Sequence, residues 1–169
     1  MGDYMFLLES HLSAGQYRVV GQMRELAAEA GLAVFLTGGA MRDTLGGFPV
    51  RDLDFTVEGS ALKLAKLAEK KFGAKIVATD EHYKSADLLF PGGITAEVAM
   101  ARQERFAKSW ARPQISPATL HAALRGRTFT VNAIALSLNK PSLGLVINPS
   151  IDFDFIDRKQ LVPFHNSSF

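Results

Sequence analysis

The chain has 169 residues, 47% of them hydrophobic, and carries 19 lysines and arginines against 17 aspartates and glutamates, a net charge of +2. This length suits a single domain with a buried core, and no apolar run approaches the ~20 residues of a membrane-spanning helix, so a membrane role is not expected. The absence of cysteine excludes disulfides, zinc–thiolate sites and thiol catalysis. Because no basic start precedes a long apolar stretch, we expect no secretion signal and a cytoplasmic protein.

The first part of the chain predicts a helix, a strand and a second helix. Apolar residues three and four positions apart predict a helix over 13–30, with Gly31 as its C-cap. A short apolar run over 33–37 predicts a strand. Two glycines at 38–39 close that strand, and residues 40–45 can begin a helix directly after them.

The middle of the chain is rich in predicted strands. Apolar and polar residues alternate over 52–57, which predicts a half-buried strand with its acidic residues on one face. An amphipathic helix is expected over 60–72. Three more strands are expected over 75–79, 86–90 and 94–100.

The last part of the chain is less regular. Residues 103–117 contain two prolines and no clear period, so we expect a mobile loop over the active face. A helix over 118–124 follows, and 129–138 begins with a turn or short helix and ends in a strand. Residues 139–169 are expected to form a short hairpin region. Strands and helices without regular βαβ alternation predict an α+β domain with one sheet.

Three carboxylates are candidates for a metal site. Asp52 and Asp54 would lie on one side of a strand, about 7 Å apart by the strand rise, so that their oxygens can converge on a hard cation. Glu97 stands alone in an apolar strand, where an unpaired charge would be costly to bury, and could supply a third carboxylate. Alternatively, the aspartates are the polar face of an edge strand and Glu97 pairs with an arginine.

The glycine turn is a candidate phosphate-binding site. Gly38 and Gly39 close a strand and open a helix, which leaves backbone N–H groups at the positive end of a helix dipole. Arg42 lies one turn further on, from where its guanidinium could reach a triphosphate. The alternatives are an ordinary tight turn and a salt bridge from Arg42 to Asp43 or Asp52.

Basic side chains gather in two clusters. One consists of Lys63, Lys66, Lys70 and Lys71 on a predicted helix, and the other of Arg102, Arg105, Lys108 and Arg112 in the predicted loop. The helix cluster is best explained as a solvated face. Neither cluster, with so small a charge surplus, identifies an RNA-binding protein.

Four segments occur in the order found in one enzyme family. They are 37–43 (TGGAMRD), 51–56 (RDLDFT), 99–104 (AMARQE) and 126–133 (GRTFTVNA). Together they resemble the N-terminal head of class II tRNA nucleotidyltransferases (CCA-adding enzymes) and bacterial poly(A) polymerases, over roughly residues 33 to 169. The resemblance implies a polymerase β-like head with one mixed sheet flanked by helices.

The resemblance also implies an activity and a site. An RNA 3′-hydroxyl, most commonly that of tRNA, would attack the α-phosphorus of ATP or CTP and release pyrophosphate, assisted by two Mg²⁺ ions. The metal ligands would be Asp52 and Asp54, with Glu97 as a further catalytic acid. The nucleotide would be bound by Gly38, Gly39, Arg42, Arg127 and Asn132.

The same resemblance implies a domain organisation. Residues 1–32 would form a helical segment packed on a catalytic head of residues 33–169. The neck, body and tail domains of the family are expected to be absent from this chain, and the neck is the part that selects the base.

Other functions remain open at this point. Within the family, poly(A) or A-only addition is the alternative to CCA addition. Gly126 and Thr128 replace an arginine and an acid of the family pattern, which motivates a second alternative, a degenerate nucleotide-binding domain without turnover. A dinucleotide-binding oxidoreductase is disfavoured, because the chain has no G-x-G-x-x-G segment.

Overall fold

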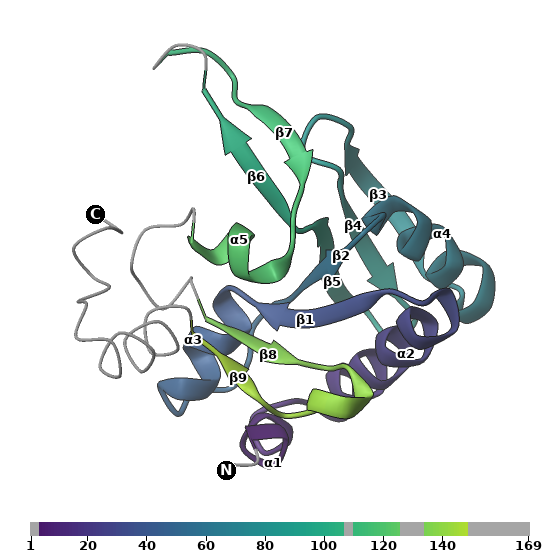
Figure 1. Ribbon diagram of the computed structural model, residues 1–169. Coiled ribbons are helices and arrows are strands. Elements are labelled where there is room, and N and C mark those ends of the chain that lie inside the picture. The colour runs from purple at the N-terminus through teal and green to yellow at the C-terminus, as the bar shows by residue number, and fades with distance from the viewer. Residues whose placement is uncertain (1–3, 107–109, 126–133, 149–169) are drawn as a thin grey trace, which may run out of the picture.

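The computed structural model describes residues 4–106, 110–125 and 134–148 (Figure 1). The helices are α1 (Tyr4–Glu9), α2 (Ala14–Ala30), α3 (Gly39–Leu45), α4 (Ala61–Phe72) and α5 (Leu120–Arg125), with a short 3₁₀ helix at Lys140–Ser142. The strands are β1 (Ala33–Thr37), β2 (Leu53–Glu58), β3 (Lys75–Asp80), β4 (Ser85–Phe90), β5 (Ile94–Met100), β6 (Arg102–Arg105), β7 (Gln114–Pro117), β8 (Ala135–Ser137) and β9 (Val146–Ile147).

Seven strands form one mixed sheet in the order β3-β4-β5-β2-β1-β8-β9. The pair β2 and β5 is parallel and every other described pair in this sheet is antiparallel. The expected α+β class with one mixed sheet is therefore confirmed. The central pair, β2 and β5, carries the predicted acidic residues at adjacent positions.

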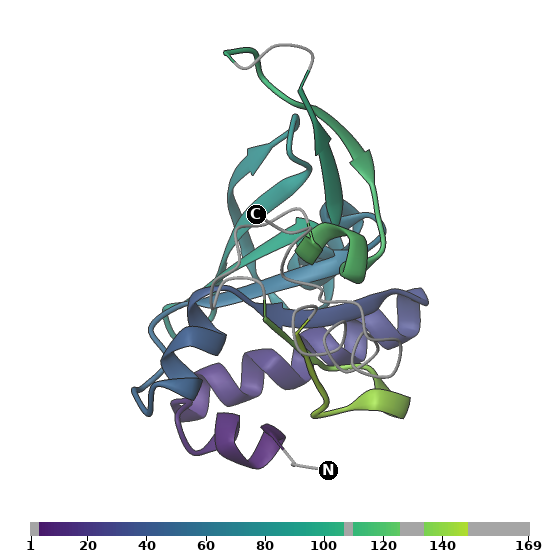
Figure 2. The ribbon, with the colours of Figure 1, turned by 60° about the vertical axis from the view of Figure 1, so that its left-hand side comes forward.

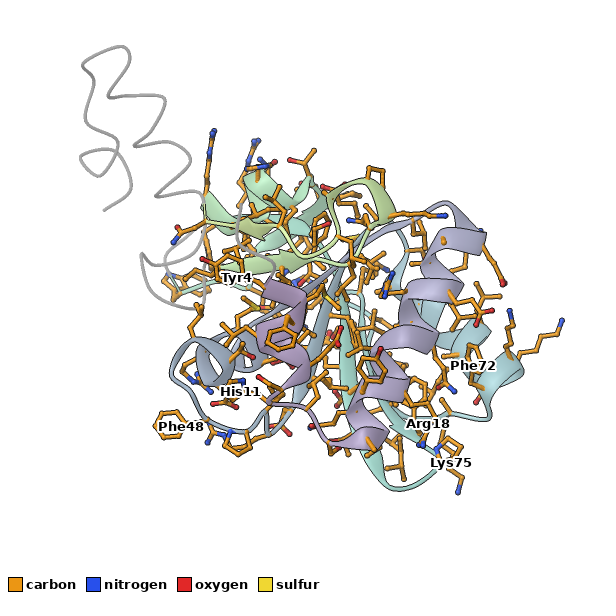
Figure 3. All side chains as sticks on the ribbon, turned by 90° about the horizontal axis from the view of Figure 1, so that it is seen from below. Tyr4, His11, Arg18, Phe48, Phe72 and Lys75 are labelled. Atoms are coloured by element: carbon orange, nitrogen blue, oxygen red, sulfur yellow. The ribbon has the colours of Figure 1, made fainter. Side chains whose placement is uncertain are left out.

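One face of the sheet carries most of the hydrophobic core. Helices α2 and α4 pack there, beside the inward side chains of β1, β2, β4 and β5, and Met5 and Leu8 of α1 extend the same cluster. Both long helices are capped at both ends, α2 by Ser13 and by Gly31, its predicted C-cap, and α4 by Ser60 and Gly73. Arg18 of α2, labelled in Figure 3, donates from Nη2 to the carbonyl oxygen of Pro91 at 2.9 Å and ties the helix to the β4–β5 turn.

Among the described residues, a helix covers the opposite face at one side only. Helix α5 packs there against Phe35 of β1 and against Ala135 and Ile147 of β8 and β9, through Leu120 and Leu124. Figure 2 shows α5 and α2 on opposite sides of β1. Because strand side chains alternate between faces, the polar residues of β2, β4 and β5 lie on the face that α2 and α4 leave open.

The expectation of a loop over 103–117 was partly wrong, because strands β6 and β7 occupy the two ends of this segment. The two strands form a hairpin, in which Arg102 pairs with Pro117 and Arg105 with Gln114, and it projects beyond the sheet (Figure 1). Its strands are almost entirely exposed, so they lack the buried alternation from which a strand is normally recognised. Two arginines of the second basic cluster are therefore on β6 and not in a loop.

The remaining C-terminal expectations are only partly covered by the described residues. Strand β8 confirms the predicted strand at the end of 129–138, and β9 pairs with it. The expected turn or short helix before β8 and the segment after 148 lie outside the described residues. No helix in the described part of the chain is long and apolar enough to cross a membrane.

Candidate active site

Three carboxylates lie side by side on the open face. Asp54 of β2 is the register partner of Glu97 of β5, and Glu97 is the partner of Asp87 of β4. Neighbouring strands are ~4.8 Å apart and directly paired residues share a face, so these side chains form a row. Asp52 directly precedes β2 and is exposed. A cleft of about 620 Å³ runs along them, and its walls include Gly39, Arg42, Asp52, Asp54, Asp87 and Glu97.

The glycine turn between β1 and α3 contacts Asp54. The backbone N–H of Gly39 donates to Oδ2 of Asp54 at 3.2 Å. Beneath it, the hydroxyl groups of Thr37 and Thr56 are buried and 2.9 Å apart, and Thr37 also donates to the carbonyl oxygen of Asp54 at 3.4 Å. The aspartate is thus held through both its main chain and its side chain.

Glycine is required at position 38 for two reasons. Its φ of 65° and ψ of −136° are a backbone conformation that residues with a Cβ rarely adopt. A Cβ there would also lie 2.8 Å from Oδ2 of Asp54. At Gly39 a Cβ would be in tight contact only with the end of the Arg42 side chain, at 3.0 Å, and in ordinary contact with Oδ2 of Asp54 at 3.8 Å, so Arg42 lies over the second glycine.

An ion pair fixes the segment that leads into Asp52. Both carboxylate oxygens of Asp43 accept from Arg51, at 3.0 Å from Nη2 and 3.2 Å from Nε, and Oδ2 also accepts from the Arg51 backbone N–H at 3.1 Å. These bonds hold the pKa of the buried Asp43 carboxyl below its ordinary value, although burial opposes the shift. Asp43 is therefore the partner of Arg51, which removes the alternative in which it binds Arg42 by a salt bridge.

The structure places most of the predicted site residues together. Glu97 is exposed in the cleft, so the argument from the cost of burying its charge was wrong, although its position beside Asp54 is as expected. Arg127 and Asn132 lie outside the described residues. Sequence reasoning missed Asp87: the alternation over 85–88 marks it as a polar residue of its strand, but only the sheet order places it beside Glu97.

The donor set suits a hard divalent cation. No three His, Asp or Glu side chains are grouped as metal ligands in the part of the chain that the structure describes. Mg²⁺, however, is commonly held by only one or two protein carboxylates together with waters and substrate phosphates. Asp52 and Asp54, which both line the cleft, match that requirement.

The poly A polymerase head-domain model matches residues 34–154. These residues include the cleft, the glycine turn and the hairpin. The chain belongs to the poly(A) polymerase head-domain family. The resemblance noted in the sequence is thereby confirmed.

Relatives of this head domain are tRNA nucleotidyltransferases. The A-adding tRNA nucleotidyltransferase of Geobacter sulfurreducens is 28% identical over 167 residues, which cover 99% of this chain and 19% of the relative. The CC-adding tRNA nucleotidyltransferase of Deinococcus radiodurans is 30% identical over 148 residues, covering 86% of this chain and 39% of the relative. The chain thus spans well under half the length of these relatives.

Solved structures of CCA-adding enzymes contain the same head domain. One apo form superimposes with a TM-score of 0.80 at 28% identity, over 94% of this chain and 37% of that one. The Thermotoga maritima CCA-adding enzyme in complex with tRNA superimposes with a TM-score of 0.72 at 26% identity, over 94% of this chain and 34% of that one. The head-domain fold and its place in a nucleotidyltransferase family therefore rest on sequence and on structure.

Proposed function

We propose that this head domain is the catalytic part of a Mg²⁺-dependent, template-independent RNA nucleotidyltransferase. It would transfer CMP or AMP from CTP or ATP to the 3′-hydroxyl of a tRNA, with loss of the hydroxyl proton and release of pyrophosphate. The observation that carries this proposal is the placement of Asp52 and Asp54 in one cleft with the glycine turn and Arg42. The activity would take place in the cytoplasm, where tRNA ends are processed.

In this proposal the carboxylates hold the cations. Asp52 and Asp54 would be the ligands, and Glu97 would complete the acidic set beside Asp54. Bound Mg²⁺ would favour ionisation of the attacking hydroxyl and neutralise the charge that develops on the phosphoryl oxygens.

The residues around the cations would orient the nucleotide. Arg42 lies over Gly39 at the edge of the cleft, where its guanidinium can pair with triphosphate oxygens. The N–H of Gly39 donates to Asp54, which gives this predicted nucleotide contact a second role in fixing the carboxylate. Arg127 and Asn132 stay predicted contacts for the phosphates and the ribose. The division into an N-terminal helical segment of residues 1–32 and a head of residues 33–169 is proposed on the same basis.

A-only addition is the second candidate. It is favoured by the A-adding relatives, among them that of Aquifex aeolicus, which is 39% identical over 117 residues. The alternative of a degenerate domain is less well supported, because the acidic pair and the residues that orient it are intact. Incorporation on tRNA acceptors that end before the first C, after one C or after two would separate CCA addition from A-only addition.

The test of the proposal is incorporation of labelled AMP and CMP into such acceptors. The wild-type chain should incorporate nucleotide only with Mg²⁺, and Asp52→Ala and Asp54→Ala should each lower the rate by at least about 10³-fold, in keeping with removal of a principal electrostatic contribution. A matched control is Glu69→Ala, an exposed acid of α4 away from the cleft. Incorporation by either aspartate variant at a rate close to that of the wild type would contradict the proposal.

A further inference from the structure

A second cleft lies between the β6–β7 hairpin and α5. Its volume is about 500 Å³, and its walls include Arg102, Gln103, Arg105, Phe106, Ser116 and Arg125. The carboxylate cleft and this groove share no lining residue. Figure 2 shows the hairpin rising directly beside α5.

The groove is positively charged. Among the described residues that line it are three arginines, Arg102, Arg105 and Arg125, and one acid, Glu104, whose Oε2 accepts from Nε of Arg102 at 3.0 Å. Arg102 is further fixed by its guanidinium, which lies 4.7 Å from the centre of the Tyr83 ring. Arg105 and Arg125 are exposed, so they place two cationic groups on opposite walls of the groove.

Aromatic side chains stand on the hairpin next to these charges. Phe106 is 53% exposed and Trp110 is 79% exposed, so both rings are accessible to a ligand. Trp110 is the single tryptophan of the chain. A basic groove with exposed aromatic rings at its edge is the combination with which proteins bind single-stranded nucleic acid, through phosphate contacts and base stacking.

Contacts on both walls hold the groove in shape. Oε2 of Glu58, at the end of β2, accepts from the backbone N–H of Leu120 at 2.6 Å and fixes the start of α5. The hairpin is tied to the β3–β4 turn, because Nε2 of His82 donates to the carbonyl oxygen of Pro113 at 2.8 Å. Glu58 is four residues beyond Asp54 on β2, which puts this end of the sheet roughly 13 Å from the carboxylates by the strand rise.

We propose that this groove binds the phosphodiester backbone of single-stranded RNA, with Phe106 and Trp110 stacking on its bases. The inference rests on the proposed function, in which RNA is a substrate, and adds a surface for the strand away from the reacting end. An incoming nucleotide is the other source of phosphate. It fits this groove less well, because the groove lies apart from the carboxylates that would hold the metal ions and shares no lining residue with their cleft.

Tryptophan fluorescence provides a direct test, because Trp110 is the only tryptophan in the sequence. A single-stranded RNA 12-mer of mixed sequence, labelled for anisotropy, would be titrated into the chain without Mg²⁺ while the Trp110 emission is followed. We expect quenching that tracks the anisotropy. In Arg105→Gln/Arg125→Gln, RNA affinity should fall at least tenfold and the salt slope should decrease by about 1.4, from ~0.7 per lost phosphate contact.

The control removes the same charge elsewhere. Lys66→Gln/Lys70→Gln on α4 lowers the net charge equally and should leave RNA affinity within about twofold, since that cluster is expected to be a solvated face. Equal losses in the two double variants, or RNA binding without a change in Trp110 emission, would overturn the proposal. So would a loss of ATP and CTP binding in the arginine variant with RNA binding retained, which would make the groove a triphosphate site.

Failure of the groove proposal can be distinguished from failure of the proposed transferase function. Binding to the groove requires no chemistry, so Asp52→Ala/Asp54→Ala should bind the RNA with unchanged affinity. RNA binding that depends on Arg105 and Arg125, in a chain that incorporates no nucleotide, would support the groove and contradict the transferase. A chain that incorporates nucleotide, but whose RNA binding does not depend on Arg105 or Arg125, would support the transferase and contradict the groove.

Discussion

At the scale of single residues, the site depends on how closely the glycine turn approaches Asp54. Position 38 has a positive φ and no room for a Cβ beside the Asp54 carboxylate, whereas position 39 is restricted only by the movable end of Arg42. The two glycines are adjacent in sequence and both are predicted to bind nucleotide. Their substitution should nevertheless have unequal effects.

We expect Gly38→Ala to displace the Asp54 carboxylate and to weaken Mg²⁺-dependent binding of ATP and CTP at least tenfold. The strained backbone should add a stability cost of about 1–3 kcal/mol. Gly39→Ala should weaken binding less than threefold, because Arg42 can shift. Titration calorimetry on both variants, with thermal unfolding to compare their stability, would measure this. Equal affinities in the two variants would contradict the geometry.

The acidic residues also show what a sequence can reveal at this scale. The alternation around Asp52 and Asp54 placed both near one strand face, and the structure agrees, with Asp52 just ahead of the strand. It did not reveal Asp87, because only the sheet order brings β4 next to β5 and aligns that side chain with Glu97. Partners across strands depend on register, which no local pattern contains.

At the scale of elements, the end of β2 and the start of α5 are joined by Glu58. Its carboxylate accepts the backbone N–H of Leu120 at 2.6 Å and so satisfies one of the unpaired amides of the first helical turn. The two residues are 62 positions apart in the chain. Helix α5 has six residues, too few to be stable alone, so its position depends on such contacts.

Glu58→Ala should therefore lower the free energy of unfolding by about 1–3 kcal/mol, the range for a hydrogen bond to a charged group whose partner loses its acceptor. Glu58→Gln keeps an acceptor oxygen and should cost less than half as much. Urea denaturation of the two variants and the wild type would measure their free energies of unfolding and show which variant is less stable. A Glu58→Ala variant as stable as the wild type would mean that α5 is held by its apolar contacts alone.

Sequence patterns predicted the elements unequally. The long helices were recognisable because each has a periodic apolar face and explicit capping residues, such as Ser13 and Gly31. The hairpin of β6 and β7 was mistaken for a loop because both its strands are solvated and carry charges where a buried strand would carry apolar residues. Its identification requires the pairing between the strands, which is a tertiary contact.

At the scale of the whole molecule, the sheet separates the main hydrophobic core from the two clefts. Its covered face supplies the core, and its open face holds the carboxylate cleft and, beyond the end of β2, the arginine groove. Family resemblance made the general fold and the acidic pair predictable. The arginine groove was not, because Arg125 of α5 joins Arg102 and Arg105 only after the chain folds.

The most direct test of the central claim is a titration of the chain with ATP and with CTP, with and without Mg²⁺. The wild type should bind both nucleotides, at least tenfold more tightly with Mg²⁺, because the cation neutralises the carboxylates that the triphosphate approaches. In Asp52→Ala/Asp54→Ala, Mg²⁺ should make no difference. A folded wild type that binds neither nucleotide, or a double variant with the same Mg²⁺ dependence as the wild type, would contradict a catalytic site at these carboxylates.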